Sequence, residues 1–189
     1  MTEAMPPTTE IDRFAQEVSD WLEKHARAWW YVANEGDKSL ARKLERDVHR
    51  RVLGVGGTRV VFGLGRTRVL KVAIWSHKSD RRYTDSNLIE AQTWEMASEP
   101  LRRLLAPVEA VAWDGSWLVM PRLVPLDPEP IPTRTRNLLN RLGIQDVFPW
   151  NVGRTSDGRI LCFDYDISNL PVQGNLPVQT ARRVGGRTP

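Results

Sequence analysis

The 189-residue sequence predicts an α+β fold, and three patterns support this class. Helical periodicity fills residues 9–25 and 37–51. Apolar β-rich runs separated by turn signals fill residues 59–75 and 108–120, and a further hairpin pattern spans residues 152–163. The lone cysteine, Cys162, excludes an intramolecular disulfide. The fold must therefore rest on a hydrophobic core, which a chain of this length can bury.

Two helices are expected before residue 52. Apolar residues recur at three- and four-residue steps from Thr9 to His25, and Thr8 or Thr9 is expected to cap this helix. A second helix is expected over residues 37–51, because leucines and a valine form one stripe along it. The sequence leaves open whether these helices pack against the rest of the chain or form a dimer contact.

The middle of the chain predicts a sheet with one helix. Two hairpins are expected, each from β-rich runs around a glycine-containing turn, and Pro100 is expected to limit the helix between them. The expected strands are residues 59–62, 68–75, 108–113 and 117–120, and the expected helix is residues 86–98.

The end of the chain predicts a smaller second unit. Five prolines make residues 121–132 an extended linker, and a short helix over residues 133–142 should close at Gly143. A last hairpin is expected from residues 152–154 and 159–163, with its turn at residues 156–158. Residues beyond 167 are expected to be mostly irregular.

Composition restricts the function. The net charge is +4, but basic and acidic residues are interleaved and no aromatic-basic stripe accompanies them, which argues against nucleic acid as a partner. The chain begins without a secretion-signal pattern and contains no apolar run of about 18 residues, so we expect a cytoplasmic protein that does not span a membrane.

A glycine-rich segment precedes a lysine inside a strand. Gly54, Gly56 and Gly57 would let backbone N–H groups approach a phosphate, although an ordinary turn would explain them equally well. Lys71 follows in a run that is apolar on both sides, which predicts a strand buried on both faces. An unpaired ammonium there would be costly, so Lys71 needs an anionic partner.

Three oxygen-bearing side chains flank the last predicted hairpin. Asp146 and Asn151 precede it and Asp164 follows it, so the hairpin should bring Asn151 and Asp164 side by side at the strand ends. Such oxygens suit Mg²⁺. Taken one at a time, these residues are equally compatible with surface turns and a strand end.

Together these segments resemble the protein-kinase-like superfamily. Gly54, Gly56 and Val61 match its glycine-rich loop, with Arg59 at the third glycine position. Lys71 matches its third-strand lysine, and Glu90 matches the glutamate that pairs with this lysine, with Glu95 as the alternative. The Asp146-to-Asn151 interval and Asp164 match its catalytic and metal-binding loops.

The resemblance implies roles for these residues. Residues 54, 56, 57, 59, 61 and 71 would bind ATP; Asn151 and Asp164 would hold Mg²⁺. Lys71, Glu90 and Asp146 would form the catalytic set, with Asp146 accepting the hydrogen bond of the acceptor hydroxyl.

The sequence also departs from the family. Ile144 and Gln145 replace the His-Arg that precedes the catalytic aspartate, and Tyr165-Asp166 replaces Phe-Gly. Only 23 residues follow Asp166, so we expect a rudimentary second lobe without an activation segment. The run from Asn87 to Trp94 is also similar to small kinase-like proteins of bacteriophages.

The sequence thus predicts a minimal kinase-like protein. We expect a helical segment (1–51), an N-lobe (52–120), a hinge (121–132), a truncated C-lobe (133–168) and a basic tail (169–189). The first functional hypothesis is a phosphotransferase acting on a Ser/Thr or small-molecule hydroxyl. The second is a nucleotide-binding pseudokinase that presents a surface to a partner protein, and the third is a basic binding protein without a nucleotide. The identity of the phosphoacceptor and the oligomeric state stay open.

Overall fold

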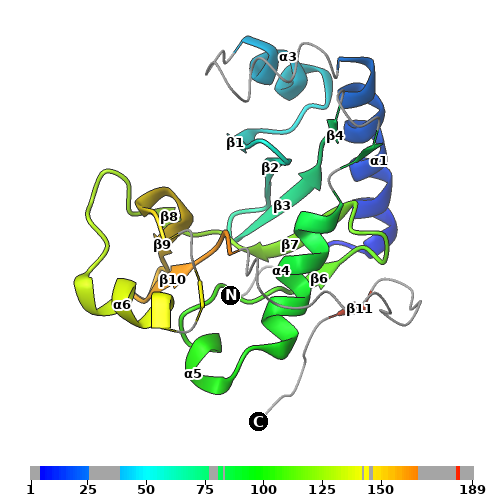
Figure 1. Cartoon of the computed structure of the whole chain (residues 1–189). Coiled ribbons are helices and arrows are strands. Elements are labelled where there is room, and N and C mark those ends of the chain that lie inside the picture. Colours follow the sequence, from blue (N-terminus) through cyan, green and yellow to red (C-terminus); the bar gives the residue numbers. More distant parts are fainter. Residues whose placement is uncertain are drawn as a thin grey trace.

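The computed structural model describes residues 5–25, 39–76, 81–82, 84–141, 143–144, 147–165 and 182–183. It confirms the α+β class, because helices pack on an antiparallel sheet and a smaller sheet follows (Figure 1). None of the helices in these ranges has the length and apolar character needed to cross a bilayer.

The larger sheet has the strand order β1-β2-β3-β7-β6-β11, with every neighbouring pair antiparallel. Its strands are β1 (Val52–Val55), β2 (Arg59–Leu64), β3 (Arg68–Ala73), β6 (Ala110–Val111), β7 (Trp117–Pro121) and β11 (Arg182–Arg183). A separate two-stranded sheet pairs β4 (Trp75–Ser76) with β5 (Arg81–Arg82). The sequence did not predict β1, since Gly54 weakens its strand pattern and the β1–β2 register shifts there.

The pleat of β2 and β3 decides what each face of the sheet carries. Phe62 and Leu70 belong to the core on the side of helix α1 (Thr8–Lys24). Their neighbours along the strands alternate to the opposite face. Val61 and Lys71 are direct register partners there, on the side of helix α4 (Asp85–Met96). This alternation places Lys71 on the same side as Glu90.

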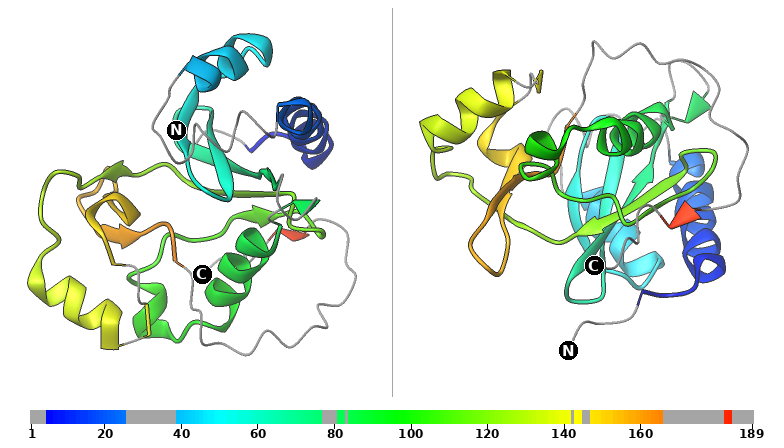
Figure 2. Two further views of the ribbon diagram at one scale, coloured as in Figure 1. Left: turned by 45° about the horizontal axis from the view of Figure 1, so that its top comes forward. Right: turned by 90° about the horizontal axis from the view of Figure 1, so that it is seen from below.

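The N-terminal helices pack against the sheet, which is the first of the two arrangements that the sequence left open (Figures 1 and 2). Phe14 of α1 meets Phe62 edge-on at a centroid separation of 5.2 Å, and Trp117 Nε1 donates to Asp12 Oδ1 at 2.7 Å. Helix α3 (Ser39–Asp47) contacts β1 and is shorter than predicted. The expected threonine cap is wrong, because Pro7 is the N-cap residue and no side chain caps α1. The N–H groups of Glu10 and Ile11 donate to the Pro7 carbonyl.

Helix α4 crosses the other face of the sheet and is held at its start by the β6–β7 connection. Buried Asn87 donates from Nδ2 to the Gly115 carbonyl at 2.8 Å. Gly115 has a φ of +73°, and a Cβ there would lie 2.5 Å from the Thr84 carbonyl oxygen, so only glycine fits this approach. A short helix α5 (Glu99–Arg102) follows, with Pro100 in its first turn, where no intrahelical N–H is needed.

The second unit is small, as predicted. It contains α6 (Thr133–Arg141), a 3₁₀ turn η1 (Pro149–Asn151) and a three-stranded sheet of order β10-β9-β8. The strands are β8 (Val124–Pro125), β9 (Val152–Arg154) and β10 (Ile160–Cys162), so the β9–β10 hairpin and α6 are confirmed. The proline-rich segment is extended and contains no helix, as predicted, and parts of it belong to strands, since β7 reaches Pro121 and β8 pairs with β9.

Candidate active site

Lys71 and Glu90 form a buried ion pair between β3 and α4. Lys71 Nζ lies 2.9 Å from Glu90 Oε1 and 3.0 Å from Oε2, and both residues are at most 3% exposed. Nζ also donates to the carbonyl of Phe163 at 2.5 Å. The predicted partner is therefore confirmed, and the alternative, Glu95, is exposed on another face of α4.

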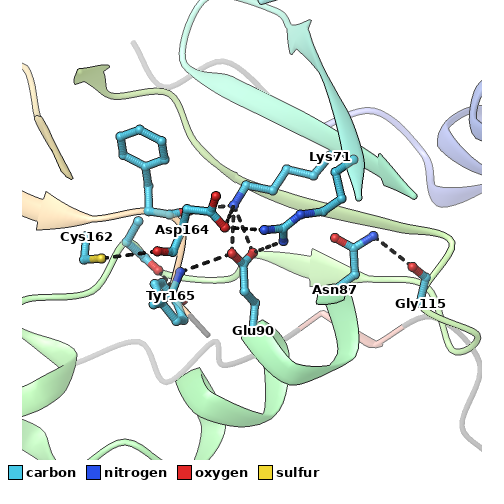
Figure 3. Close-up of polar contacts among 10 residues, drawn as sticks. Lys71, Asn87, Glu90, Gly115, Cys162, Asp164 and Tyr165 are labelled. Carbon is cyan, nitrogen blue, oxygen red and sulfur yellow. Dashed lines mark hydrogen bonds and ion pairs between the residues drawn. The ribbon is translucent and has the colours of Figure 1, made fainter. Parts of the chain in front are cut away.

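Arg59 joins this pair to Asp164. Its Nη1 lies 2.9 Å from Glu90 Oε2, and its Nη2 contacts Asp164 Oδ1. Lys71 Nζ is 3.9 Å from the same Asp164 oxygen. Figure 3 shows Lys71, Glu90 and Asp164 pointing toward one another. Two cations and two carboxylates thus share one site, which we name the charge cluster: Arg59, Lys71, Glu90 and Asp164.

The sheet geometry explains why Arg59 reaches the cluster. Arg59, Val61 and Lys71 lie on the same face of β2 and β3, since Val61 pairs with Lys71 and Arg59 pairs with Ala73. The sequence placed Arg59 as a cation beside the phosphates. The structure adds that its guanidinium contacts both carboxylates and that its side chain is 11% exposed.

The β9–β10 hairpin brings Asn151 and Asp164 together, as predicted. Phe163 N donates to the Asn151 carbonyl at 2.9 Å, which closes the open end of the hairpin. Gly153 permits the packing of this hairpin, because a Cβ there would lie 2.7 Å from Leu123 Cβ. Asn151 and Asp164 consequently line one pocket of about 180 Å³.

The pocket also contains residues that sequence reasoning missed. Thr58 precedes β2, Ser86 lies in the first turn of α4, and Tyr165 follows Asp164. A signal for Ser86 was present, because it precedes Glu90 by four residues and so shares its helix face. The pocket lining consists of Thr58, Arg59, Ser86, Glu90, Asn151, Asp164 and Tyr165.

Tyr165 anchors the segment that carries Asp164. Its side chain is fully buried, and its hydroxyl donates to the Ala106 carbonyl at 2.8 Å. Its backbone N–H donates to Glu90 Oε1 at 3.4 Å. Burial raises the pKa of the Tyr165 phenol well above its usual value, so the hydroxyl stays a donor. Tyr165 therefore ties the end of β10 to both the core and the charge cluster.

The charges in the cluster shift one another's protonation. Burial and the neighbouring Arg59 lower the pKa of Lys71, outweighing the attraction of the two carboxylates. Burial would raise the pKa of Asp164, but Lys71 and Arg59 outweigh it and lower that pKa below its ordinary value. Asp164 is consequently an anion at neutral pH.

The glycine-rich segment lies over the start of β2. Gly54 is within β1 beside Val61, and Gly56 N donates to the Arg59 carbonyl at 2.8 Å. A Cβ on Gly57 would meet nothing within 4 Å, so the surrounding space does not require glycine at this position. The segment forms the turn that leads into Thr58 and Arg59 at the pocket.

Asp146, the expected acceptor of the hydroxyl hydrogen bond, lies outside the described residues, as do Gln145 and Asp166. The described neighbours Ile144 and Val147 are both buried in the core of the second unit. The structure thus brings together Lys71, Glu90, Arg59, Asn151 and Asp164, and leaves the position of Asp146 untested.

The oxygen donors at the pocket fit Mg²⁺ in type but are few. Asn151 and Asp164 offer amide and carboxylate oxygens, which are the ligands that Mg²⁺ prefers. Within the described ranges no group of three His, Cys, Asp or Glu side chains could hold a metal ion. A metal here would need further oxygen ligands, as Mg²⁺ commonly takes from substrate phosphates.

Comparison with known proteins gives distant likenesses among solved structures alone. No protein-family model and no curated protein sequence matches the chain. Among solved structures, it is similar to WbdD in its co-crystal structure with the kinase inhibitor LY294002, with a TM-score of 0.43 and 18% sequence identity. The match covers 66% of this chain and 42% of the other, so this chain spans less than half of that protein's chain. The side chains of the pocket are therefore the guide to function.

Proposed function

We propose that the protein is an ATP- and Mg²⁺-dependent phosphotransferase that transfers the γ-phosphoryl group to a Ser/Thr or small-molecule hydroxyl. One observation carries the proposal: the buried Lys71–Glu90 pair borders a pocket that also contains Asp164 and Asn151. Buried ion pairs add little net stability compared with apolar residues. Buried charges with shifted pKa values beside a pocket are instead typical of functional sites.

Each side chain has a role in this proposal. Lys71 would bind the nucleotide phosphates, and Glu90 would hold its ammonium in place. Asn151 and Asp164 would hold Mg²⁺, which when bound would neutralise phosphate charge. In the transfer, the acceptor oxygen forms a bond to the γ-phosphorus while the bond to the bridging oxygen of ADP breaks. The hydroxyl proton passes to Asp146, whose role rests on the sequence alone.

The volume of the pocket supports a phosphate site in particular. It is about 180 Å³, less than the roughly 300–1,000 Å³ typical of pockets that enclose a whole small ligand. Its lining combines the Arg59 guanidinium, the hydroxyl groups of Thr58 and Ser86, and amide and carboxylate oxygens. This lining suits the polyphosphate end of a nucleotide.

A second candidate, the pseudokinase, is favoured by one specific observation. The Arg59 guanidinium contacts the carboxylate that would have to hold Mg²⁺. If Arg59 keeps this position when a nucleotide is bound, the site would bind phosphate without activating it for transfer. The two candidates therefore agree on nucleotide binding and differ on turnover.

Thermal unfolding with Mg-ATP tests nucleotide binding. At about a hundredfold excess over its dissociation constant, Mg-ATP should add roughly 2.7 kcal/mol to the free energy of unfolding. For this chain length the melting temperature should rise by about 5–10 °C. Asp164→Asn should remove the rise, and Asp157→Asn, at the exposed turn of the same hairpin, should keep it. No rise with any nucleotide would leave the basic binding protein as the surviving hypothesis.

Incubation with γ-labelled ATP then separates enzyme from pseudokinase. Label should pass to the protein itself or to an added Ser/Thr peptide or hydroxyl compound, and Lys71→Met should abolish the transfer. Lys24→Met is the matched control, because Lys24 is exposed on α1. A melting shift without transfer to any acceptor would favour the pseudokinase.

A further inference from the structure

Arg59 contacts Asp164, which is the exposed one of the two carboxylates that line the pocket. Its guanidinium contacts Asp164 Oδ1, and Lys71 Nζ lies 3.9 Å from the same oxygen. Asp164 itself is accessible, with 44% of its side chain exposed. A divalent cation approaching from solvent would reach Asp164 but would meet two positive charges already beside it.

Arg59 is not needed to neutralise the Glu90 carboxylate. Lys71 already lies within 3.0 Å of both Glu90 oxygens. Glu90 would therefore keep a charged partner if Arg59 turned away. The guanidinium is then free to exchange Asp164 for another anion without leaving a buried carboxylate unpaired.

A phosphate group is the anion that fits. Thr58 and Ser86 line the same pocket as Arg59 and carry hydroxyl groups, which can donate to phosphate oxygens. A guanidinium binds phosphate with two parallel N–H donors and so competes well for it. Within the described residues no group of three His, Cys, Asp or Glu side chains could hold a metal ion, and a bound phosphate would supply further oxygen ligands.

We propose that Arg59 makes metal binding at Asp164 conditional on a phosphate group in the pocket. Without phosphate, the guanidinium neutralises Asp164 and keeps a lone divalent cation out. When phosphate enters beside Thr58 and Ser86, Arg59 turns to it and Asp164 becomes a metal ligand. The inference rests on the proposed function in one respect, the assignment of Asp164 to the metal.

Binding of Mn²⁺ to the full chain, followed by electron paramagnetic resonance without any nucleotide, tests this. The wild-type protein should bind Mn²⁺ at least tenfold more tightly when inorganic phosphate is present at saturation. By linkage, Mn²⁺ should tighten phosphate binding by the same factor. This comparison uses the unaltered protein and does not depend on a variant that folds.

Variants identify the residue responsible. Arg59→Gln should bind Mn²⁺ alone about tenfold more tightly than wild type, and its response to phosphate should largely disappear. Arg159→Gln is the matched control, because Arg159 forms an exposed pair with Asp157 at the other end of the hairpin, and it should behave as wild type.

The outcomes separate the inference from the proposed function. Equal Mn²⁺ affinity with and without phosphate in the wild type, or no change in Arg59→Gln, would overturn the role of Arg59. Loss of Mn²⁺ binding in Asp164→Asn alongside either result would leave the metal assignment intact. Unchanged Mn²⁺ binding in Asp164→Asn would instead remove that assignment, and with it the proposed function.

Discussion

The β9–β10 hairpin has an Asp–Arg ion pair at each end, and the two pairs differ in sequence separation and in solvent exposure. At the turn, Arg159 Nε lies 2.9 Å from Asp157 Oδ2, two residues away, and both side chains are more than half exposed. At the open end, Asp164 meets an arginine that is 105 residues distant in sequence and 11% exposed.

The difference shows how the same two residue types serve different purposes. The exposed pair is screened by water and salt and follows from local turn geometry. The pair at the open end exists because the sheet, α4 and the hairpin converge on one pocket. The comparison predicts that substitutions at the open end change ligand binding, whereas substitutions at the turn leave it unchanged. It also predicts that replacing an ion-pair residue lowers the free energy of unfolding more at the open end than at the turn.

The largest effect should come from Glu90, the anion shared by both buried cations. Glu90→Ala leaves Lys71 and Arg59 without their common carboxylate, so the free energy of unfolding should fall by about 3–5 kcal/mol. Urea unfolding measures this. Glu95→Ala, on the exposed side of the same helix, should stay within about 0.5 kcal/mol of wild type. An equal fall in the free energy of unfolding in both variants would contradict a stabilising role for the charge cluster.

The next effect concerns the packing of the hairpin. Gly153→Ala would place a Cβ 2.7 Å from Leu123 Cβ and 2.9 Å from the Val124 carbonyl oxygen, so stability should fall by about 1–3 kcal/mol. The displaced hairpin should also weaken ATP binding. In Gly158→Ala, at the turn, the positive φ of 86° costs about 1–2 kcal/mol without a contact near the pocket. ATP affinity should therefore separate the two variants even where urea unfolding does not.

The smallest effect is the acid dependence of stability. A carboxyl whose pKa is lower in the folded chain stabilises the fold above its unfolded pKa, of about 3.9, and this stabilisation is lost as pH falls through the folded pKa. Lys71 and Arg59 lower the pKa of Asp164 against the effect of burial, whereas hydrogen bonds from Thr155 and Arg159 lower that of Asp157. The stability difference between wild type and Asp164→Asn should therefore shrink below about pH 4.

Salt distinguishes the two aspartates in the same measurement. The difference in the free energy of unfolding between wild type and Asp157→Asn is expected to be smaller than that for Asp164→Asn. At 1 M salt the Debye length is about 3 Å, so the Asp157→Asn difference should vanish. The difference for Asp164→Asn should persist, because its cationic partners are buried. Equal salt sensitivity at both ends of the hairpin would contradict the comparison.

The sequence could predict the features that depend on short-range pattern. The hairpin followed from its turn residues, and the Lys71–Glu90 pair followed from strand burial and the resemblance to kinases. The position of α1 on the sheet could not be predicted, because an amphipathic helix does not specify which apolar surface it covers. The contact between Arg59 and Asp164 was missed because no local pattern relates two residues that are 105 positions apart in sequence.

Calorimetric titration with ATP and excess Mg²⁺ tests most directly whether the charge cluster binds phosphate. For a cation and for an anion in turn, a variant that removes the charge at the cluster is compared with one that removes the same charge elsewhere. Lys71→Met and Asp164→Asn should weaken ATP binding at least tenfold. Lys24→Met and Asp157→Asn should match the wild type. Wild-type affinity in Lys71→Met and Asp164→Asn, or no binding of ATP to the wild type, would contradict a phosphate site at the charge cluster.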